Sequence, residues 1–116
     1  MIRATDIPRK FDSKLERDFW FHLAAALETG GIKSFGYQTM RFRIGGRFEG
    51  KQRAESFYTP DFVVRTPTDE LVLYDTKGHT REAASVRMRA CATLHPFRVV
   101  AAYKSKNGWE FEEVTP

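Results

Sequence analysis

The chain has 116 residues, of which 41% are hydrophobic, and this length predicts one domain, residues 1–116, with a modest core. No apolar run approaches the ~18 residues of a membrane span, and the single cysteine, Cys91, excludes an internal disulfide and a zinc site built from cysteines. The net charge of +4 is compatible with binding to nucleic acid, although many basic domains bind none.

Residues 1–11 are predicted to form a flexible arm, because they are polar and terminal. They lack the apolar centre of a signal peptide, so the cytoplasm is the expected compartment.

The first helix is predicted over residues 12–29, because apolar side chains recur with helical spacing and two glycines follow. Glu16 lies inside the apolar arc of this helix, between Leu23 and Leu27, and a carboxylate on a buried face needs a partner. Ser13-x-x-Glu16 is the pattern of a capping box, in which the glutamate returns to a backbone N–H. The acidic residues further along the chain favour a second interpretation, in which Glu16 is the third carboxylate of an active site.

Residues 35–44 are predicted to form a strand, because Met40, Phe42 and Ile44 alternate with arginines. We expect the three apolar side chains to face inward. Gln38 shares their face, and a place beside an active site and a hydrogen bond at a strand edge are equally favoured for it.

A basic stretch begins in this strand and continues into a segment with three glycines. A glycine-containing basic loop suits a phosphate backbone, whereas the alternative is a charged strand edge that blocks aggregation. DNA contacts are expected from Arg41, Arg43, Arg47, Lys51 and Arg53.

Residues 57–65 and 71–77 are predicted to pair as a hairpin around a polar, proline-containing break. A turn symmetric about Thr68 places Asp61 opposite Asp75, and like charges directly opposite each other repel. One carboxyl is therefore pushed toward neutrality unless a cation lies between the two. Alternation along the strand places Lys77 on the face of Asp75. Two carboxylates and a lysine at one strand end indicate a hydrolytic site for a hard divalent ion such as Mg²⁺.

Residues 80–95 are predicted to form the second helix, capped by Thr80, with Ala84, Met88 and Cys91 on one face. Arg87 belongs to a solvated helix face by default, and a phosphate contact is the alternative.

His79 is a candidate neighbour of the site, because it follows Lys77 closely, but an ordinary surface role is favoured for it. Residues 97–103 and 109–114 are predicted strands around an Asn-Gly turn. Lys104 and Lys106 form a small basic tip at this turn.

Pro60-Asp61, followed after thirteen residues by Asp75-Thr76-Lys77, resembles the motif of the PD-(D/E)XK nuclease superfamily. Residues 11–16, 58–62 and 75–78 are similar to blocks of bacteriophage endonuclease I, a family of Holliday-junction resolvases, and of related small phage nucleases. The resemblance covers roughly residues 11–103. It implies an α/β, restriction-endonuclease-like fold with an αβββαβ core. In this fold a mixed central sheet is flanked by helices, and in this chain a C-terminal strand follows the core. The element order read from periodicity agrees with it.

The resemblance also implies roles for individual residues. Asp61, Asp75, the Thr76 carbonyl and Glu16 would bind Mg²⁺, for which Mn²⁺ substitutes, and Lys77 would orient or activate the attacking water. Glu16, Asp61, Asp75 and Lys77 would thus be the catalytic set. Resolvases of this type act on branched DNA as homodimers, so junction DNA and a second copy of the chain are the implied partners, in the host cytoplasm if the protein is phage-encoded.

The expected function is therefore that of a metal-dependent DNA endonuclease that hydrolyses phosphodiester bonds, selects branched structures and serves phage or mobile-element DNA processing. The alternatives are a general or partner-directed nuclease for duplexes or transposon ends, and a DNA-binding module of the same fold without catalysis. The intact set of three acids and a lysine argues against the last alternative.

Overall fold

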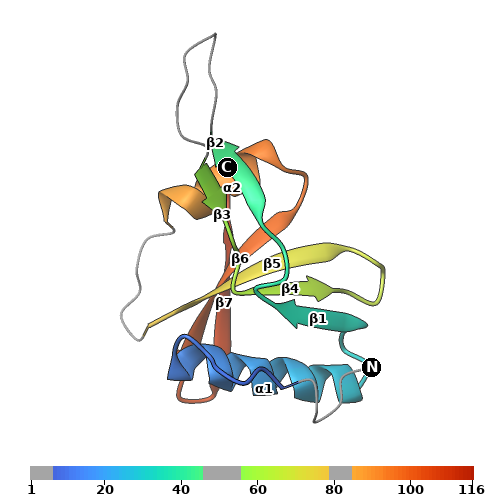
Figure 1. Ribbon diagram of the computed structural model, residues 1–116. Coiled ribbons are helices and arrows are strands. Elements are labelled where there is room, and N and C mark those ends of the chain that lie inside the picture. The colour runs from blue at the N-terminus through green and yellow to red at the C-terminus, as the bar shows by residue number, and fades with distance from the viewer. Residues whose placement is uncertain (1–6, 46–55, 79–84) are drawn as a thin grey trace, which may run out of the picture.

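The computed structural model describes residues 7–45, 56–78 and 85–116 (Figure 1). In these ranges the elements, in chain order, are α1 Lys14–Glu28, β1 Ser34–Tyr37, β2 Phe42–Gly45, β3 Ser56–Tyr58, β4 Phe62–Arg65, β5 Leu71–Lys77, α2 Val86–Leu94, β6 Arg98–Ser105 and β7 Gly108–Val114.

The main sheet has five strands in the order β1-β4-β5-β6-β7, and β5 and β6 run parallel while the other neighbours are antiparallel. Taken without β2 and β3, the elements follow the order α1, β1, β4, β5, α2, β6, with β7 added at the C-terminal end. The α/β class, the αβββαβ order, the mixed sheet and the additional last strand are therefore confirmed.

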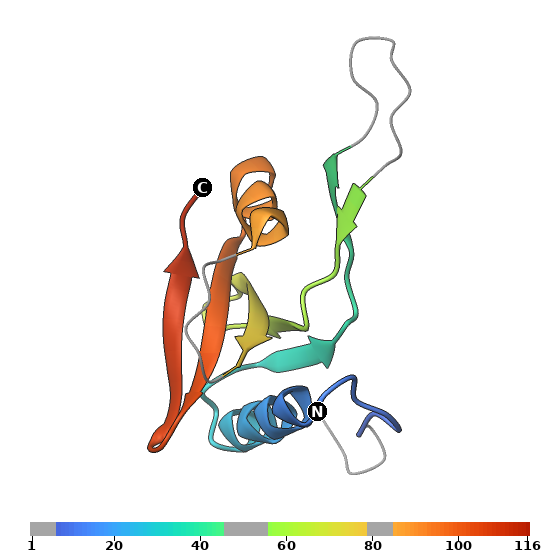
Figure 2. The ribbon, with the colours of Figure 1, turned by 90° about the vertical axis from the view of Figure 1, so that its left-hand side faces the viewer.

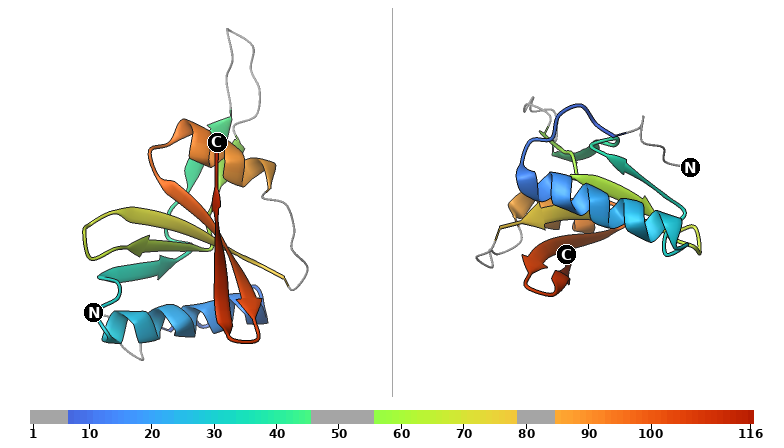
Figure 3. Two further views of the ribbon diagram at one scale, coloured as in Figure 1. Left: turned by 180° about the vertical axis from the view of Figure 1, so that it is seen from behind. Right: turned by 90° about the horizontal axis from the view of Figure 1, so that it is seen from below.

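The two faces of this sheet carry separate apolar clusters, because neighbouring residues of a strand point to opposite sides. Phe19, Trp20 and Leu23 of α1 pack with Phe62 and other residues on one face. The cluster on the other face joins the side chains Met88 and Cys91 of α2 to Phe42, Tyr58, Val63, Leu73, Val99, Ala101, Tyr103 and Val114. Figure 2 and the view from below in Figure 3 show α1 lying across the sheet on the side away from α2.

The predicted helix boundaries are partly wrong. α1 begins at Lys14 rather than at residue 12, because Ser13 is its N-cap and its hydroxyl accepts a hydrogen bond from the Glu16 N–H. α2 begins at Val86 and is capped by Ser85, so it is shorter than predicted; the proposed cap Thr80 and Ala84 lie outside the described residues.

The single strand predicted over residues 35–44 is also wrong. β1 pairs with β4 in the main sheet, whereas β2 pairs with β3 in a separate two-stranded sheet that extends away from it (Figures 1 and 2). Gln38 has a left-handed backbone with φ of 52°, which breaks the strand between them. The turn also brings the Thr39 side chain close to Gly36. A Cβ added at Gly36 would lie 2.6 Å from the Thr39 side chain, so this position requires a glycine. Met40 is consequently 38% exposed and does not face the core, while Phe42 is buried.

The strand predicted over residues 57–65 divides in the same way, into β3 and β4, at Thr59-Pro60-Asp61. Proline has no N–H to donate to a ladder, which accounts for the interruption. Among the helices of the described ranges, none combines the length and apolar character that crossing a membrane requires.

Candidate functional site

Asp61 and Asp75 are held against each other at the end of the β4–β5 hairpin. The strand register pairs Phe62 with Tyr74, so the next pair outward is Asp61 and Asp75, as the symmetric turn predicts. The Asp61 N–H donates to Asp75 Oδ1 at 2.9 Å. Asp61 Oδ2 in turn accepts from the N–H and the hydroxyl of Thr76, at 2.9 and 3.0 Å. These bonds fix the Asp61 carboxyl group on Thr76 of β5 and the Asp75 carboxyl group on the backbone just before β4.

The pKa values of both carboxyl groups are raised. Burial and then the charge of Asp75 raise the pKa of Asp61 to about 7, against the opposing effect of the two Thr76 bonds. Burial likewise raises the pKa of Asp75, although the hydrogen bond from the Asp61 N–H, the approach of the Tyr58 hydroxyl and the charge of Lys77 lower it in part. Two partly buried acids that disfavour each other's charge form a place where a cation would be stabilised.

Glu16 is buried, with 7% of its surface exposed, and both of its carboxylate oxygens are hydrogen-bonded. Oε2 accepts from the Ser13 hydroxyl at 2.7 Å and Oε1 from the Tyr37 hydroxyl at 2.9 Å. The expected capping partner, the Ser13 backbone N–H, is thus replaced by the Ser13 side chain. The charge of Glu16 contributes to the raised pKa values of Asp61 and Asp75, so its carboxylate lies in the same electrostatic environment.

Of the residues described so far, Asp61 and Asp75 are the ones whose chemistry suits a divalent metal ion. In the part of the chain that the structure describes, no three side chains of the types His, Cys, Asp and Glu are grouped closely enough to hold an ion. Both carboxylate oxygens of Glu16 accept hydrogen bonds from hydroxyl groups, so Glu16 is not positioned to bind a metal ion directly in this arrangement. The chemistry of the two aspartates, hard oxygen donors that repel each other, suits Mg²⁺ or Mn²⁺.

Two tyrosines of the site were not predicted from the sequence. Tyr58 is 4% exposed, and its hydroxyl forms no hydrogen bond of standard geometry among the described residues. Burial, the charge of Asp75 and the hydrogen-bonding approach of the hydroxyl to that carboxylate raise the pKa of Tyr58, so its hydroxyl group lies next to Asp75. Burial and the bond to Glu16 raise the pKa of Tyr37 to about 12, although the Asp12 N–H lowers it. The only advance signal was that Tyr58 begins the Tyr-Thr-Pro-Asp-Phe block.

Gln38 supports the local structure and does not bind the acid pair through its side chain. Its side-chain amide donates to Asp12 Oδ2 at 2.8 Å, and its backbone N–H donates to the Asp61 carbonyl at 2.9 Å. Of the two roles weighed for Gln38, the structure favours the hydrogen bond that ties a strand edge to the segment before α1.

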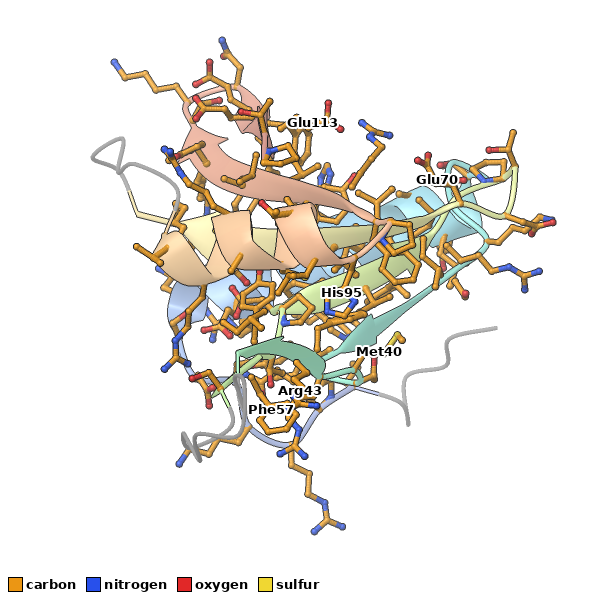
Figure 4. The ribbon with its side chains drawn as sticks, turned by 90° about the horizontal axis from the view of Figure 1, so that it is seen from above. Met40, Arg43, Phe57, Glu70, His95 and Glu113 are labelled. Carbon is orange, nitrogen blue, oxygen red and sulfur yellow. The ribbon has the colours of Figure 1, made fainter. Side chains whose placement is uncertain are left out.

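The predicted DNA-binding arginines in the described ranges lie around the β2–β3 sheet. The Arg41 guanidinium stacks 4.1 Å above the ring of Phe57, and Arg87 of α2 donates to the Phe57 carbonyl at 3.4 Å. Figure 4 shows Arg43 and Phe57 together on this sheet, and the Arg43 carbonyl is within 2.8 Å of the His95 ring. Arg47, Lys51, Arg53 and His79 lie outside the described residues.

The different hydrogen bonding of the two tyrosines leads to different expected effects on stability. Tyr37→Phe removes a hydroxyl that is bonded to a carboxylate and should lower the free energy of unfolding by about 1–3 kcal/mol. Tyr58→Phe removes a buried hydroxyl that approaches Asp75 without a hydrogen bond of standard geometry to the described residues, and should change the free energy of unfolding by less than about 1 kcal/mol. Urea unfolding of both variants without metal measures the difference, and equal losses would show that Tyr58 is hydrogen-bonded in solution.

Comparison with known proteins identifies a family for this chain, but that family has no described activity. A family model with the description "Protein of unknown function (DUF1064)" matches residues 4–109. No curated protein and no solved structure matches the chain.

Proposed function

We propose a function from the site itself, because the chain belongs to the DUF1064 family of proteins of unknown function. The protein is a metal-dependent DNA endonuclease of the PD-(D/E)XK type, and branched DNA is its first candidate substrate. The observation that carries this proposal is the pair Asp61 and Asp75, which are locked together by backbone hydrogen bonds and have raised pKa values, with the charge of Lys77 beside them.

Asp61 and Asp75 would hold a Mg²⁺ ion, with the Thr76 carbonyl as a further ligand. When bound, such an ion supplies a Lewis acid that stabilises charge on a phosphate oxygen and lowers the pKa of water. In the described residues Asp61 Oδ1 accepts no hydrogen bond, so one oxygen of this acid is available without breaking the bonds to Thr76.

The other residues of the site act on the water and the phosphate. Lys77 lies close enough to Asp75 to lower its pKa, and it adds positive charge where a nucleophile and a phosphate would meet. Glu16, held by Ser13 and Tyr37, contributes negative charge from α1 and would strengthen the attraction for a second cation. The buried Tyr58 hydroxyl lies next to Asp75 without a hydrogen bond of standard geometry to the described residues, and it would donate to an oxygen brought in by the substrate. Hydrolysis in this superfamily leaves a 5′-phosphate, which is the expected product end.

Strand cleavage of synthetic DNA tests the proposal directly. A four-way junction and a linear duplex of the same sequence are incubated with the protein in Mg²⁺, in Mn²⁺ and in chelator, and the products are separated on a denaturing gel. We expect the junction to be cut in preference to the duplex, only with metal, leaving ends that a ligase joins without added kinase.

The alternatives give different results in the same assay. Equal cutting of both substrates would indicate a general or partner-directed nuclease. Binding without cutting in either ion would contradict the enzymatic proposal and indicate a DNA-binding module. Sedimentation of the protein with and without junction would test the homodimer that resolving a junction requires, since two strands must be cut.

A further inference from the structure

A second feature of the same end of the molecule is a cavity of about 440 Å³ between α1 and the ends of β5 and β6. This volume is within the ~300–1,000 Å³ range of small-molecule sites. Figures 1 and 3 show the N-terminal half of α1, the end of β5 and the tip of the β6–β7 hairpin next to one another. The residues that line the cavity are Lys14, Leu15, Asp18, Gly78 and Lys104.

The charges around the cavity are predominantly positive. Lys104 Nζ lies 2.6 Å from Asp18 Oδ2, and this bond is the main cause of the lowered pKa of Asp18, with the charges of Arg17 and Lys14 adding to it. Arg17 also approaches Asp18 at 4.0 Å. Three cations therefore surround one carboxylate, and the Lys104 side chain remains 40% exposed. Such a group attracts an anion, and a lysine held in place by a carboxylate is already oriented to meet it.

Gly78 at the edge of the cavity is not explained by the protein alone. Its φ is not in the left-handed region, since the positive-φ glycines of the described chain are Gly30 and Gly108. A Cβ built on Gly78 would have no atom of the described residues within 4 Å, so neither the backbone conformation nor the packing of those residues requires a glycine there. A side chain at this position would instead occupy the cavity.

Gly78 links the cavity to the strand that carries Asp75. It lies three residues beyond Asp75, which is ~10 Å along an extended chain. Phosphates of one DNA strand follow one another at about 3.4 Å along the helix axis, so a strand with one phosphate at Asp61 and Asp75 has another at this distance within a few nucleotides.

We propose that this cavity binds a backbone phosphate of the DNA strand that is cut, within a few nucleotides of the phosphate at the aspartate pair, with Lys104 and Lys14 as its cationic contacts. The assignment rests on the proposed nuclease function and extends it by naming where the strand leaves the site. Asp18 is a positioning residue, because it acts on the phosphate through Lys104.

Two lysines on the same hairpin provide a matched test. Lys104→Gln and Lys106→Gln each remove one positive charge, but Lys104 lines the cavity and Lys106 does not. DNA binding is measured by fluorescence anisotropy in Ca²⁺, without cleavage, from 50 to 200 mM salt. The slope of log K against log salt should fall by about 0.9 for Lys104→Gln, the value for one lost phosphate contact, and by clearly less for Lys106→Gln. Equal changes would overturn the proposal, because they would indicate diffuse attraction to the hairpin tip.

Side chains of increasing size at Gly78 test the space itself. Gly78→Ala should melt at the wild-type temperature, because an added Cβ meets no atom of the described residues within 4 Å, and the melting temperature of Gly78→Leu shows whether the longer side chain is also accommodated. Gly78→Leu should weaken DNA binding by about tenfold, and the DNA affinity of Gly78→Ala should lie between those of the wild type and Gly78→Leu. Unchanged DNA affinity in a folded Gly78→Leu protein would overturn the proposal, as would tight binding of inorganic phosphate alone that depends on Lys104, since that result would indicate a site for free phosphate.

These measurements separate the cavity from the catalytic proposal. A wild-type protein that cuts DNA but responds equally to the two lysine changes keeps the nuclease function and loses the phosphate site. A protein that binds DNA through Lys104 but cuts nothing keeps the phosphate site and loses the nuclease function.

Discussion

Asp61→Asn is expected to lower metal-dependent DNA cleavage by at least about 10³-fold, because it removes a charged metal ligand. The same change should make the metal-free protein more stable at pH 8. The amide oxygen of asparagine can still accept the two hydrogen bonds from Thr76, so the hairpin keeps its geometry. What disappears is a carboxylate that burial and the charge of Asp75 make unfavourable.

The pH dependence of this effect follows from the direction of the pKa shift. The pKa of Asp61 is raised from 3.8 to about 7 on folding, so the folded state binds the proton more tightly than the unfolded chain. The stability that Asp61 contributes is therefore complete below pH 4 and is lost as the pH rises to about 7. The difference amounts to roughly 4 kcal/mol at most. Asp61→Asn and wild type should thus have similar melting temperatures at pH 4, and the variant should melt several degrees higher at pH 8.

Thermal unfolding at pH 4, 5.5 and 8 in chelator, repeated with Mg²⁺, measures this effect. Mg²⁺ should raise the melting temperature of the wild type and not of the variant. Glu28→Gln, the same chemical change on the exposed end of α1, is the control and should alter neither cleavage nor melting. An Asp61→Asn protein that melts lower than wild type at pH 8 would make Asp61 a structural acceptor, and one that still cuts DNA would remove it from the catalytic set.

The hairpin register was predictable because both runs are short, apolar and bounded by a turn. The observed pair Arg65 and Leu71 fixes the rest of the ladder, and Asp61 and Asp75 follow as neighbours without further information. Ser13 was predictable as the N-cap for a similar reason, since its contacts are within one helical turn.

The break after β1 was missed although the sequence contained a sign of it. Phe35 and Tyr37 pack on the side of α1, whereas Phe42 and Ile44 pack on the side of α2. The buried positions thus change from odd to even numbers, which a continuous strand with a period of two does not do. The left-handed Gln38 accommodates that change, and no propensity of glutamine predicts it.

The environment of Glu16 was only half predictable. Local spacing predicted a partnership with Ser13, but Tyr37 comes from a strand that packs on α1 only in the folded chain. Likewise, the approach of the Tyr58 hydroxyl to Asp75 depends on how β3 lies relative to β5, which no sequence pattern encodes. Both oxygens of Glu16 have a partner, since one accepts from Ser13 at the helix start and the other from Tyr37 of β1.

Lys77→Met is expected to slow single-turnover cleavage at saturating Mg²⁺ by about 10²–10⁴-fold, because it removes a positive charge and a donor at the water and phosphate. It should also move Mg²⁺ binding to higher pH. The charge of Lys77 lowers the pKa of Asp75, so without it Asp75 holds its proton to a higher pH, and a protonated carboxyl is a poor metal ligand.

Lys77→Arg separates the two effects. It keeps the charge, so the pH dependence of Mg²⁺ binding, measured by calorimetry from pH 5 to 9, should return toward that of the wild type. Cleavage should remain slow, because a planar guanidinium does not reproduce the position and donor geometry of an ammonium group. If Lys77→Met instead cuts at the wild-type rate once Mg²⁺ is saturating, then Lys77 acts only through the ionisation of Asp75. The attacking water would in that case have to be oriented by another donor, for which the buried hydroxyl of Tyr58 beside that carboxylate is a candidate.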